Sequence, residues 1–268
     1  MLDQGRTFTW LQRGFAALVV IYVIIPLGVT AVVAFSNDNI IRFPIRGYSG
    51  RWFGEFLKDP QWIDAAWNSL QVALLTAGMS MALAVPASYA LARARAHRTK
   101  IQTLLLLPLF VPGVVLGISV GIGLGGLEVF GAPLFGSRFL VACAHTLWAV
   151  PLAITVLEPS FETLDRSLVE AAGDLGASPL RGFFGVTLPL TKTGIVSAAL
   201  FSFITSMNEF IMALFLTTRD TQTLPVLLWL SLRSSSTPVL AVASFILAGS
   251  VFAVLAIGYI WYALSRRR

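Results

Sequence analysis

Charged residues are scarce in this chain of 268 residues. Asp, Glu, Lys and Arg together make up 12% of it, against about 25% in a typical soluble domain. Hydrophobic residues make up 56%, and the mean hydropathy is +0.80. Such a chain lacks the charge needed to cover a water-facing surface, so its composition indicates an integral membrane protein.

Cysteine and histidine are also scarce, which limits the chemistry that the chain can perform. The single cysteine, Cys143, lies in an apolar run, which excludes a disulfide framework and a cysteine-rich metal site. The two histidines, His97 and His145, are far apart in the sequence, and we expect His145 to be hydrogen-bonded inside a helix bundle rather than to relay protons. None of the lysines follows a glycine, so there is no G-x4-G-K-[ST] phosphate-binding loop. We predict no catalytic residue, no metal and no cofactor bound by this chain.

Six apolar stretches are long enough to cross a membrane, since about 20 residues span a ~30 Å hydrocarbon core. Backbone polar groups must be satisfied inside lipid, so each stretch should be a helix. The predicted fold is an all-α integral membrane protein of one domain, residues 1–268, with six transmembrane helices. The first is too long for a signal-peptide core and is expected to be retained. The spans are residues 14–35, 66–92, 104–125, 139–157, 193–216 and 239–264.

Lys and Arg are distributed unequally between the two sides that these spans define. One side carries twelve of the 19 and the other seven. The positive-inside rule then places both termini and residues 158–192 in the cytoplasm. Topology accounts for the formal charge of +6 better than nucleic-acid binding does. In the outer loop 36–65, aromatic residues alternate with charges, which favours a short interfacial helix that anchors the loop over one that contacts a protein.

Residues 158–192 hold eight charged residues between two apolar stretches, so this segment must lie in water. Pro159 is expected to end the fourth span, because proline cannot continue a helix without losing a hydrogen bond. A helix should follow from Phe161, with leucines and alanines forming one apolar face. Gly176 fits its C′ stop, and Ser178 and Pro179 fit the N-cap and first residue of another short helix.

The middle of this segment has the residue types that allow close contact with a partner. Ala171, Ala172 and Gly173 have so little side chain that the helix can approach a partner closely. Glu170 and Asp174 are four residues apart, share a helix face and can meet basic or hydrogen-bonding groups. From the residues alone, an amphipathic interfacial helix without a partner is an equally good interpretation.

The spacing from Glu170 onward resembles a known signature. The pattern E-A-A-x3-G-x9-I-x-L-P is typical of the membrane subunits of binding-protein-dependent ABC importers, and this chain departs from it only by Val186 in place of Ile. Residues 47–53, 66–70, 107–118 and 145–151 are similar to spermidine/putrescine-type permeases within that family. The resemblance implies that one segment docks on a cytoplasmic ATPase and transmits its closure to the spans. That segment comprises Glu170, Ala171, Ala172, Gly173, Asp174, Leu175, Gly176, Ala177, Ser178 and Pro179.

The resemblance also implies partners and a location. The chain would be a multi-pass permease of the bacterial inner membrane that pairs with a second homologous permease. A homodimeric ATPase subunit would bind ATP and Mg, and a periplasmic binding protein would deliver a small solute such as a polyamine, an opine or an amino-acid derivative. Membrane lipid is expected as a partner and nucleic acid is not.

The third span carries two features of bending and close packing. Pro108 and Pro112 each remove a hydrogen bond, so we expect a kinked helix. After them comes a ladder of small residues that allows helices to approach closely, either as static packing or as a moving interface in the pathway. The ladder consists of Gly113, Gly117, Gly121 and Gly125.

The fifth span contains Glu209, an acid well inside a predicted membrane helix. A buried carboxylate needs a cavity or a partner, and Glu209 lies about 24 Å beyond Thr193 at 1.5 Å per residue, in the outer third of the bilayer. We leave open whether it lines the pathway or bonds to a partner permease. Asn208 beside it, with Ser202 and Thr205 on preceding turns, completes the pathway candidates. Spermidine-type permeases usually have Asp-Glu here, so Asn208 weakens the case for a strongly cationic cargo.

Two other classes of protein compete with the importer permease. A secondary, ion-coupled transporter is disfavoured by the single acid within the spans and by the lack of inverted sequence halves. An intramembrane enzyme would need clustered nucleophiles, bases or metal ligands, and the zinc-binding pattern H-E-x-x-H is absent from the sequence.

Overall fold

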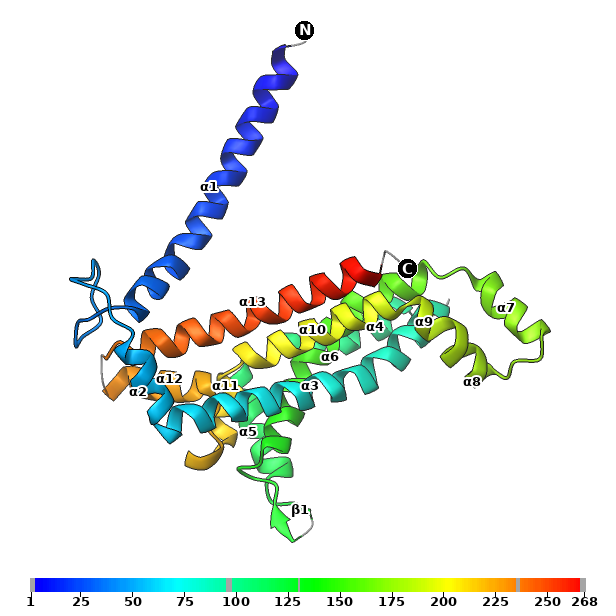
Figure 1. The fold of residues 1–268 in the computed structure, drawn as a ribbon. Coiled ribbons are helices and arrows are strands. Elements are labelled where there is room, and N and C mark those ends of the chain that lie inside the picture. The colour runs from blue at the N-terminus through cyan, green and yellow to red at the C-terminus, as the bar shows by residue number, and fades with distance from the viewer. Residues whose placement is uncertain (1–2, 95–97, 130, 235–236, 266–268) are drawn as a thin grey trace. The chain divides into compact units, whose positions relative to one another are not determined.

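The computed structural model describes residues 3–94, 98–129, 131–234 and 237–265, which are helical apart from one two-stranded hairpin and the connecting segments (Figure 1). The chain forms two compact units, which we describe separately. The first comprises Met1–Ile63 and Leu228–Gly249, and the second comprises Asp64–Leu227 and Ser250–Arg268.

The first unit contains α1 (Asp3–Ala34), α2 (Arg51–Lys58), the start of α3 (Pro60–Arg93), the end of α12 (Leu224–Ser234) and the start of α13 (Val239–Ser265). The apolar side chains of α1 are largely exposed, as expected of a helix that faces lipid. The short helix predicted in the outer loop is present as α2, and it buries Phe56 against Trp62. The rings of Phe35, Phe53 and Phe245 pack together, with the ring centroids of Phe35 and Phe53 4.8 Å apart.

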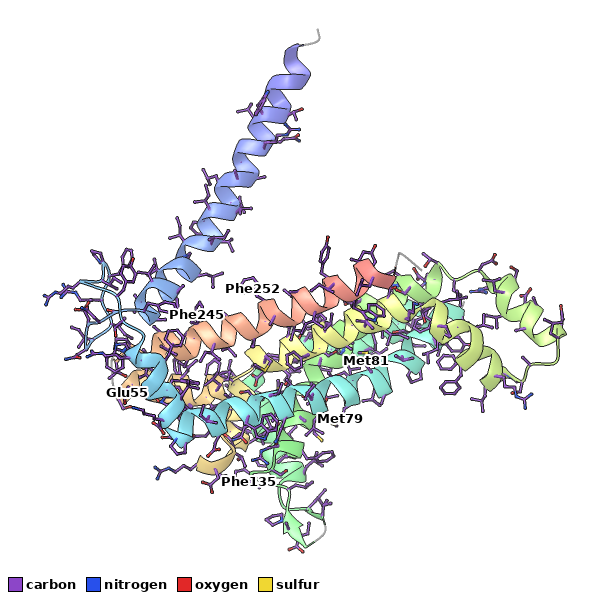
Figure 2. The ribbon with its side chains drawn as sticks, viewed as in Figure 1. Glu55, Met79, Met81, Phe135, Phe245 and Phe252 are labelled. Carbon is purple, nitrogen blue, oxygen red and sulfur yellow. The ribbon has the colours of Figure 1, made fainter. Side chains whose placement is uncertain are left out.

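The second unit is built around α6 (Arg138–Glu162), which packs along α10 (Lys192–Asn208). Two clusters of buried side chains form its core, one around Leu140 and Met212 and the other around Leu157 and Ala198. Met79 on α3 packs against the first cluster and Met81 against the second (Figure 2). Helix α3 therefore packs against both clusters.

Within the part of the chain that the structure describes, four helices are long and apolar enough to cross a membrane, and two bent helix pairs would bring the number to six. The four are the Thr9–Ala34 part of α1, α3, α6 and the Val239–Leu264 part of α13. One bent pair joins Arg98–Phe110 to Gly113–Leu124 at 93°, and the other joins Pro179–Leu190 to Lys192–Asn208 at 74°. The predicted class, a mostly helical protein with membrane spans, is confirmed, and the number of six spans stays a prediction.

The third predicted span is broken rather than kinked. It consists of α4 (Arg98–Leu106), the 3-10 turn η1 (Leu107–Phe110) and α5 (Gly113–Leu124). Val111 and Pro112 between them have ψ angles of 129° and 135°, which are extended. A residue before proline is pushed out of the helical region, so Pro112 converts the expected kink into a break.

Pro159 does not end α6, contrary to the prediction. The helix continues to Glu162, and Leu157 and Phe161 on either side of the proline are buried. A proline inside a helix costs about 3 kcal/mol, and the packing of these side chains offsets that cost. Pro151 lies inside the same helix. Membrane helices tolerate proline because neighbouring groups satisfy the freed carbonyls.

The remaining elements are short. They are β1 (Glu128–Val129), β2 (Ala132–Pro133), α7 (Arg166–Asp174), α8 (Pro179–Gly182), the π-helical turn η2 (Phe183–Thr187), α9 (Leu188–Leu190), α11 (Ile211–Leu216) and η3 (Arg219–Thr221). The sequence did not predict α11 as a separate helix, nor α12.

Candidate coupling and pathway sites

Helix α7 begins later than predicted, at Arg166 rather than Phe161, because α6 occupies the chain up to Glu162. Asp165 is the N-cap, and its side chain accepts a hydrogen bond from the Ser167 N–H at 3.0 Å. This bond lowers the pKa of the exposed Asp165 carboxyl. A carboxylate at a helix N-terminus also matches the helix dipole.

Helix α7 ends in a tight turn at the predicted glycine. Gly176 has a φ of +84°, which residues other than glycine rarely adopt. The Ala177 N–H bonds to the Ala172 carbonyl at 2.9 Å and the Gly176 N–H to the Gly173 carbonyl at 2.8 Å. This pair of bonds is a Schellman motif. Ser178 then caps α8, as predicted, by accepting from the Arg181 N–H.

The α7–α8 region presents large apolar side chains to its surroundings. Leu175 is 89% exposed, Leu180 70% and Phe184 62%. Glu170 and Asp174 are also exposed, and a Cβ added at Gly173 would meet nothing within 4 Å. The two helices project from one end of the second unit (Figure 1). Exposed apolar residues next to acids mark a surface that another molecule can cover.

Two contacts hold α7 in place. Val169 faces the buried Gly182 of α8, so the two helices pack on each other. The Arg166 guanidinium donates to the Ala92 carbonyl at the end of α3, with an Nη2–O distance of 3.0 Å. In the sequence, Arg166 was counted only as a positive charge that indicates topology. Its hydrogen bond to Ala92 appears only in the structure.

The predicted fifth span is interrupted at Glu209, between α10 and α11. Glu209 is extended, with a ψ of 126°, and its carboxylate accepts from the Met212 N–H at 2.9 and 3.1 Å and from the Ala213 N–H at 3.3 Å. These are the free N–H groups at the start of α11. The carboxylate therefore caps that helix and is stabilised by its dipole.

A buried polar cluster surrounds the Glu209 carboxylate. His145 Nε2 on α6 lies 3.0 Å from Glu209 Oε2, and these side chains are 1% and 4% exposed. His145 Nδ1 lies 2.8 Å from Ser206 Oγ, which donates to Thr76 Oγ1 at 3.2 Å. Among the described residues, no three His, Cys, Asp or Glu side chains gather as metal ligands.

This geometry revises the interpretation of the pathway candidates. Glu209 has a partner for its buried charge in His145 of the same chain, and its predicted roles in the pathway or at a partner permease stay predictions. Ser202 is also buried, and its hydroxyl donates to the Ala198 carbonyl at 2.9 Å. Of the four candidates, Asn208 is exposed and Thr205 is half-buried. The prediction that His145 is hydrogen-bonded inside the bundle is confirmed.

The glycine ladder packs on the helix that follows Glu209. A Cβ on Gly117 would lie 3.0 Å from the Met212 Cα, and one on Gly121 would lie 3.2 Å from Leu216. Gly113 faces Trp148, and Gly125 lies just past α5 against Phe135 (Figure 2). These contacts place α5 directly against α11, as a small-residue surface allows.

Comparison with known proteins identifies the class to which this fold and these sites belong. The family model described as binding-protein-dependent transport system inner membrane component matches residues 75–268. The chain belongs to this family and is a permease subunit of an ABC importer.

Individual relatives agree with this class. The chain is 29% identical over 245 residues to the putrescine transport system permease protein PotI of Escherichia coli, covering 90% of this chain and 86% of that one. It is 34% identical over 204 residues to a "Probable molybdenum ABC transporter permease protein" of Haloferax volcanii, covering 73% and 76%. The fold is similar to a bacterial alginate ABC transporter solved with a periplasmic protein, with a TM-score of 0.70, 15% identity and coverage of 99% and 96%.

Proposed function

We propose that the chain forms six membrane spans, with both termini in the cytoplasm, and couples them to an ATPase through α7 and α8. The observation that carries this proposal is the exposed surface of Leu175, Leu180 and Phe184 beside Glu170 and Asp174. This surface stands on a helix pair whose turn is rigidly closed by the Schellman motif. A rigid projection is suited to transmitting the movement of a partner.

The chain itself would not be catalytic. ATP and Mg would be bound and hydrolysed by a homodimeric cytoplasmic ATPase, and a second homologous permease would complete the pathway. A periplasmic binding protein would deliver the solute, as the family description and the alginate transporter support. Family membership does not favour the secondary, ion-coupled transporter.

The cargo would be a small solute such as a polyamine, an opine or an amino-acid derivative. Two of the relatives are named for putrescine and for molybdenum, so cargo differs within the family. The Glu209 carboxylate is occupied by His145 and the N–H groups of α11, and it is not free to bind a cation. The exposed Asn208 at the break is neutral. We infer that selectivity rests largely with the binding protein.

The test is ATP-dependent uptake by the reconstituted importer carrying Glu170→Arg or Gly173→Trp. A side chain at position 173 has open space within this chain, so the tryptophan should insert and fold normally but block docking. We expect uptake to fall about tenfold or more, because coupling free energies between two sites are typically about 1–3 kcal/mol. Gly126→Trp is the matched control, because Gly126 is an exposed glycine with equal space on the opposite side of the proposed topology. Unchanged uptake in both variants would refute the docking role.

A further inference from the structure

Helix α4 makes limited apolar contact with the rest of the second unit, through Leu105, which packs against the cluster around Leu157. None of its residues, Arg98 to Leu106, is buried. A cavity of about 210 Å³ lies between α4 and α6, and its lining includes Leu106, Ile154 and Thr155. Close packing is therefore incomplete here, and apolar contact alone does not fix α4 to α6.

Polar side chains bridge the two helices instead. Arg98 Nε and Nη2 donate to Glu158 Oε1 at 3.0 and 2.5 Å, and Arg98 Nη2 also contacts the Glu162 carboxylate. Gln102 Nε2 donates to both Glu158 oxygens at 2.6 and 2.7 Å. Arg98 and Gln102 are four residues apart on α4, and the two glutamates are four apart on α6, so one turn of α4 contacts one turn of α6. The Glu158 side chain is only 12% exposed, which shields these bonds from water.

This cluster lies at the base of the α7–α8 projection. Glu162 is the last residue of α6, and only residues 163–165 separate it from α7. Arg166, the first residue of α7, is tied to the end of α3 through the Ala92 carbonyl. A displacement of α7 therefore acts directly on the turn of α6 that Arg98 holds.

The other end of α4 leads to the pathway candidates. The chain passes through η1, whose Pro108 carbonyl accepts from Trp148 Nε1 at 3.0 Å, and then through the break into α5. Gly117 and Gly121 of α5 lie against α11, the helix that Glu209 caps. A continuous series of contacts thus joins the base of α7 to the α10–α11 break.

We infer that Arg98 is a positioning residue: its bonds to Glu158 and Glu162, supported by Gln102, make α4 follow the end of α6. Movement of α7 then reaches α5 and α11. This inference rests on the proposed function, because it assigns the route by which the proposed coupling surface acts on the spans. Arg98 touches neither the solute nor the ATPase in this role.

The first test compares Arg98→Ala and Glu158→Gln with Lys100→Ala in the complete importer. Lys100 is an exposed cation on the same helix, so its removal changes the charge of α4 but not the bridge. Removing a charge-assisted bond and its coupling should lower the number of solute molecules moved per ATP hydrolysed by about tenfold. ATP hydrolysis and co-purification with the ATPase should persist, because the α7–α8 surface is intact.

The outcomes separate this inference from the proposed function. If the wild-type complex shows no ATP-dependent uptake, the proposed function fails. If it does, and Arg98→Ala moves as much solute per ATP as Lys100→Ala, the inference is wrong and the proposed function stands.

A second variant guards against a simple folding defect. In a Cys143→Ala background, Arg98→Cys and Glu162→Cys remove the bonds of Arg98 and leave those of Gln102, and a short bifunctional thiol reagent can join the two new cysteines covalently. We expect the double variant to be uncoupled and the cross-linked form to regain most of the lost solute-to-ATP ratio. Failure to cross-link, or a cross-linked complex that stays uncoupled, would overturn the inference.

Discussion

The pair of His145 and Glu209 gives the most direct prediction of the structure, through the variant Glu209→Gln. Both side chains are almost fully buried, 3.0 Å apart. The carboxylate also accepts three hydrogen-bond contacts from the Met212 and Ala213 N–H groups. Glutamine keeps the shape and one acceptor oxygen, but it removes the charge that stabilises the imidazole and the start of α11.

The expected cost follows from this burial. A hydrogen bond to a charged acceptor contributes about 1.5–3 kcal/mol, and the variant weakens such bonds from buried N–H groups that no water can reach. For a protein of this size, each kcal/mol lowers the midpoint of thermal unfolding by about 2–4 °C. Glu209→Gln should therefore lower that midpoint by roughly 5–10 °C.

The assay is thermal unfolding of the detergent-solubilised importer, with Glu128→Gln as the control. Glu128 is an exposed carboxylate on β1, so its loss should change stability by no more than about 0.5 kcal/mol. The double variant His145→Gln and Glu209→Gln removes both members of the pair. It should cost less than the sum of the two single variants, by about 1 kcal/mol or more.

Two results would refute this reasoning. One is a Glu209→Gln protein as stable as the Glu128→Gln control, with its uptake changed, which would mean that the carboxylate lines the pathway. The other is strict additivity in the double variant, which would mean that His145 and Glu209 do not interact.

Two further predictions concern α5 and α7. Gly117→Ala should destabilise the importer by about 1–3 kcal/mol, because the new methyl group would meet the Met212 backbone at 3.0 Å, whereas Gly123→Ala has open space and should be neutral in the same unfolding measurement. The hydrogen bond from the Ser167 N–H lowers the pKa of Asp165 in the folded protein. The ionised cap therefore stabilises α7 fully above the pKa of the unfolded chain. This stabilisation is lost as the pH falls through the lower pKa of the folded protein. Asp165→Asn should remove this acid sensitivity from amide hydrogen exchange in α7, and an unchanged pH profile in that variant would contradict the assignment.

Features that depend on neighbouring residues could be predicted from the sequence. The apolar stretches, the N-cap at Ser178 and the stop at Gly176 all depend on hydrophobicity or on bonds within a few residues, so their outcome does not require knowledge of the fold. The residue types of the 158–192 segment likewise pointed to an exposed projection, and the structure shows Leu175 and Leu180 exposed. The predicted start of the following helix at Phe161 was wrong, because packing around Pro159 lets α6 continue to Glu162.

Features that depend on distant residues appeared only in the tertiary structure. Glu209 lies at the α10–α11 break and His145 on α6, while Arg98 and Glu158 lie on α4 and α6, and each carboxylate could have been paired with any cation brought near it by folding. Local pattern showed that Glu209 needs a partner, because a buried charge is costly, but the choice of partner depends on how α6, α10 and α11 pack. The composition of the chain thus determined that it is a membrane protein, and short local patterns determined the helix stop at Gly176 and the helix cap at Ser178. The packing of the helices decided which of its few charged side chains form pairs.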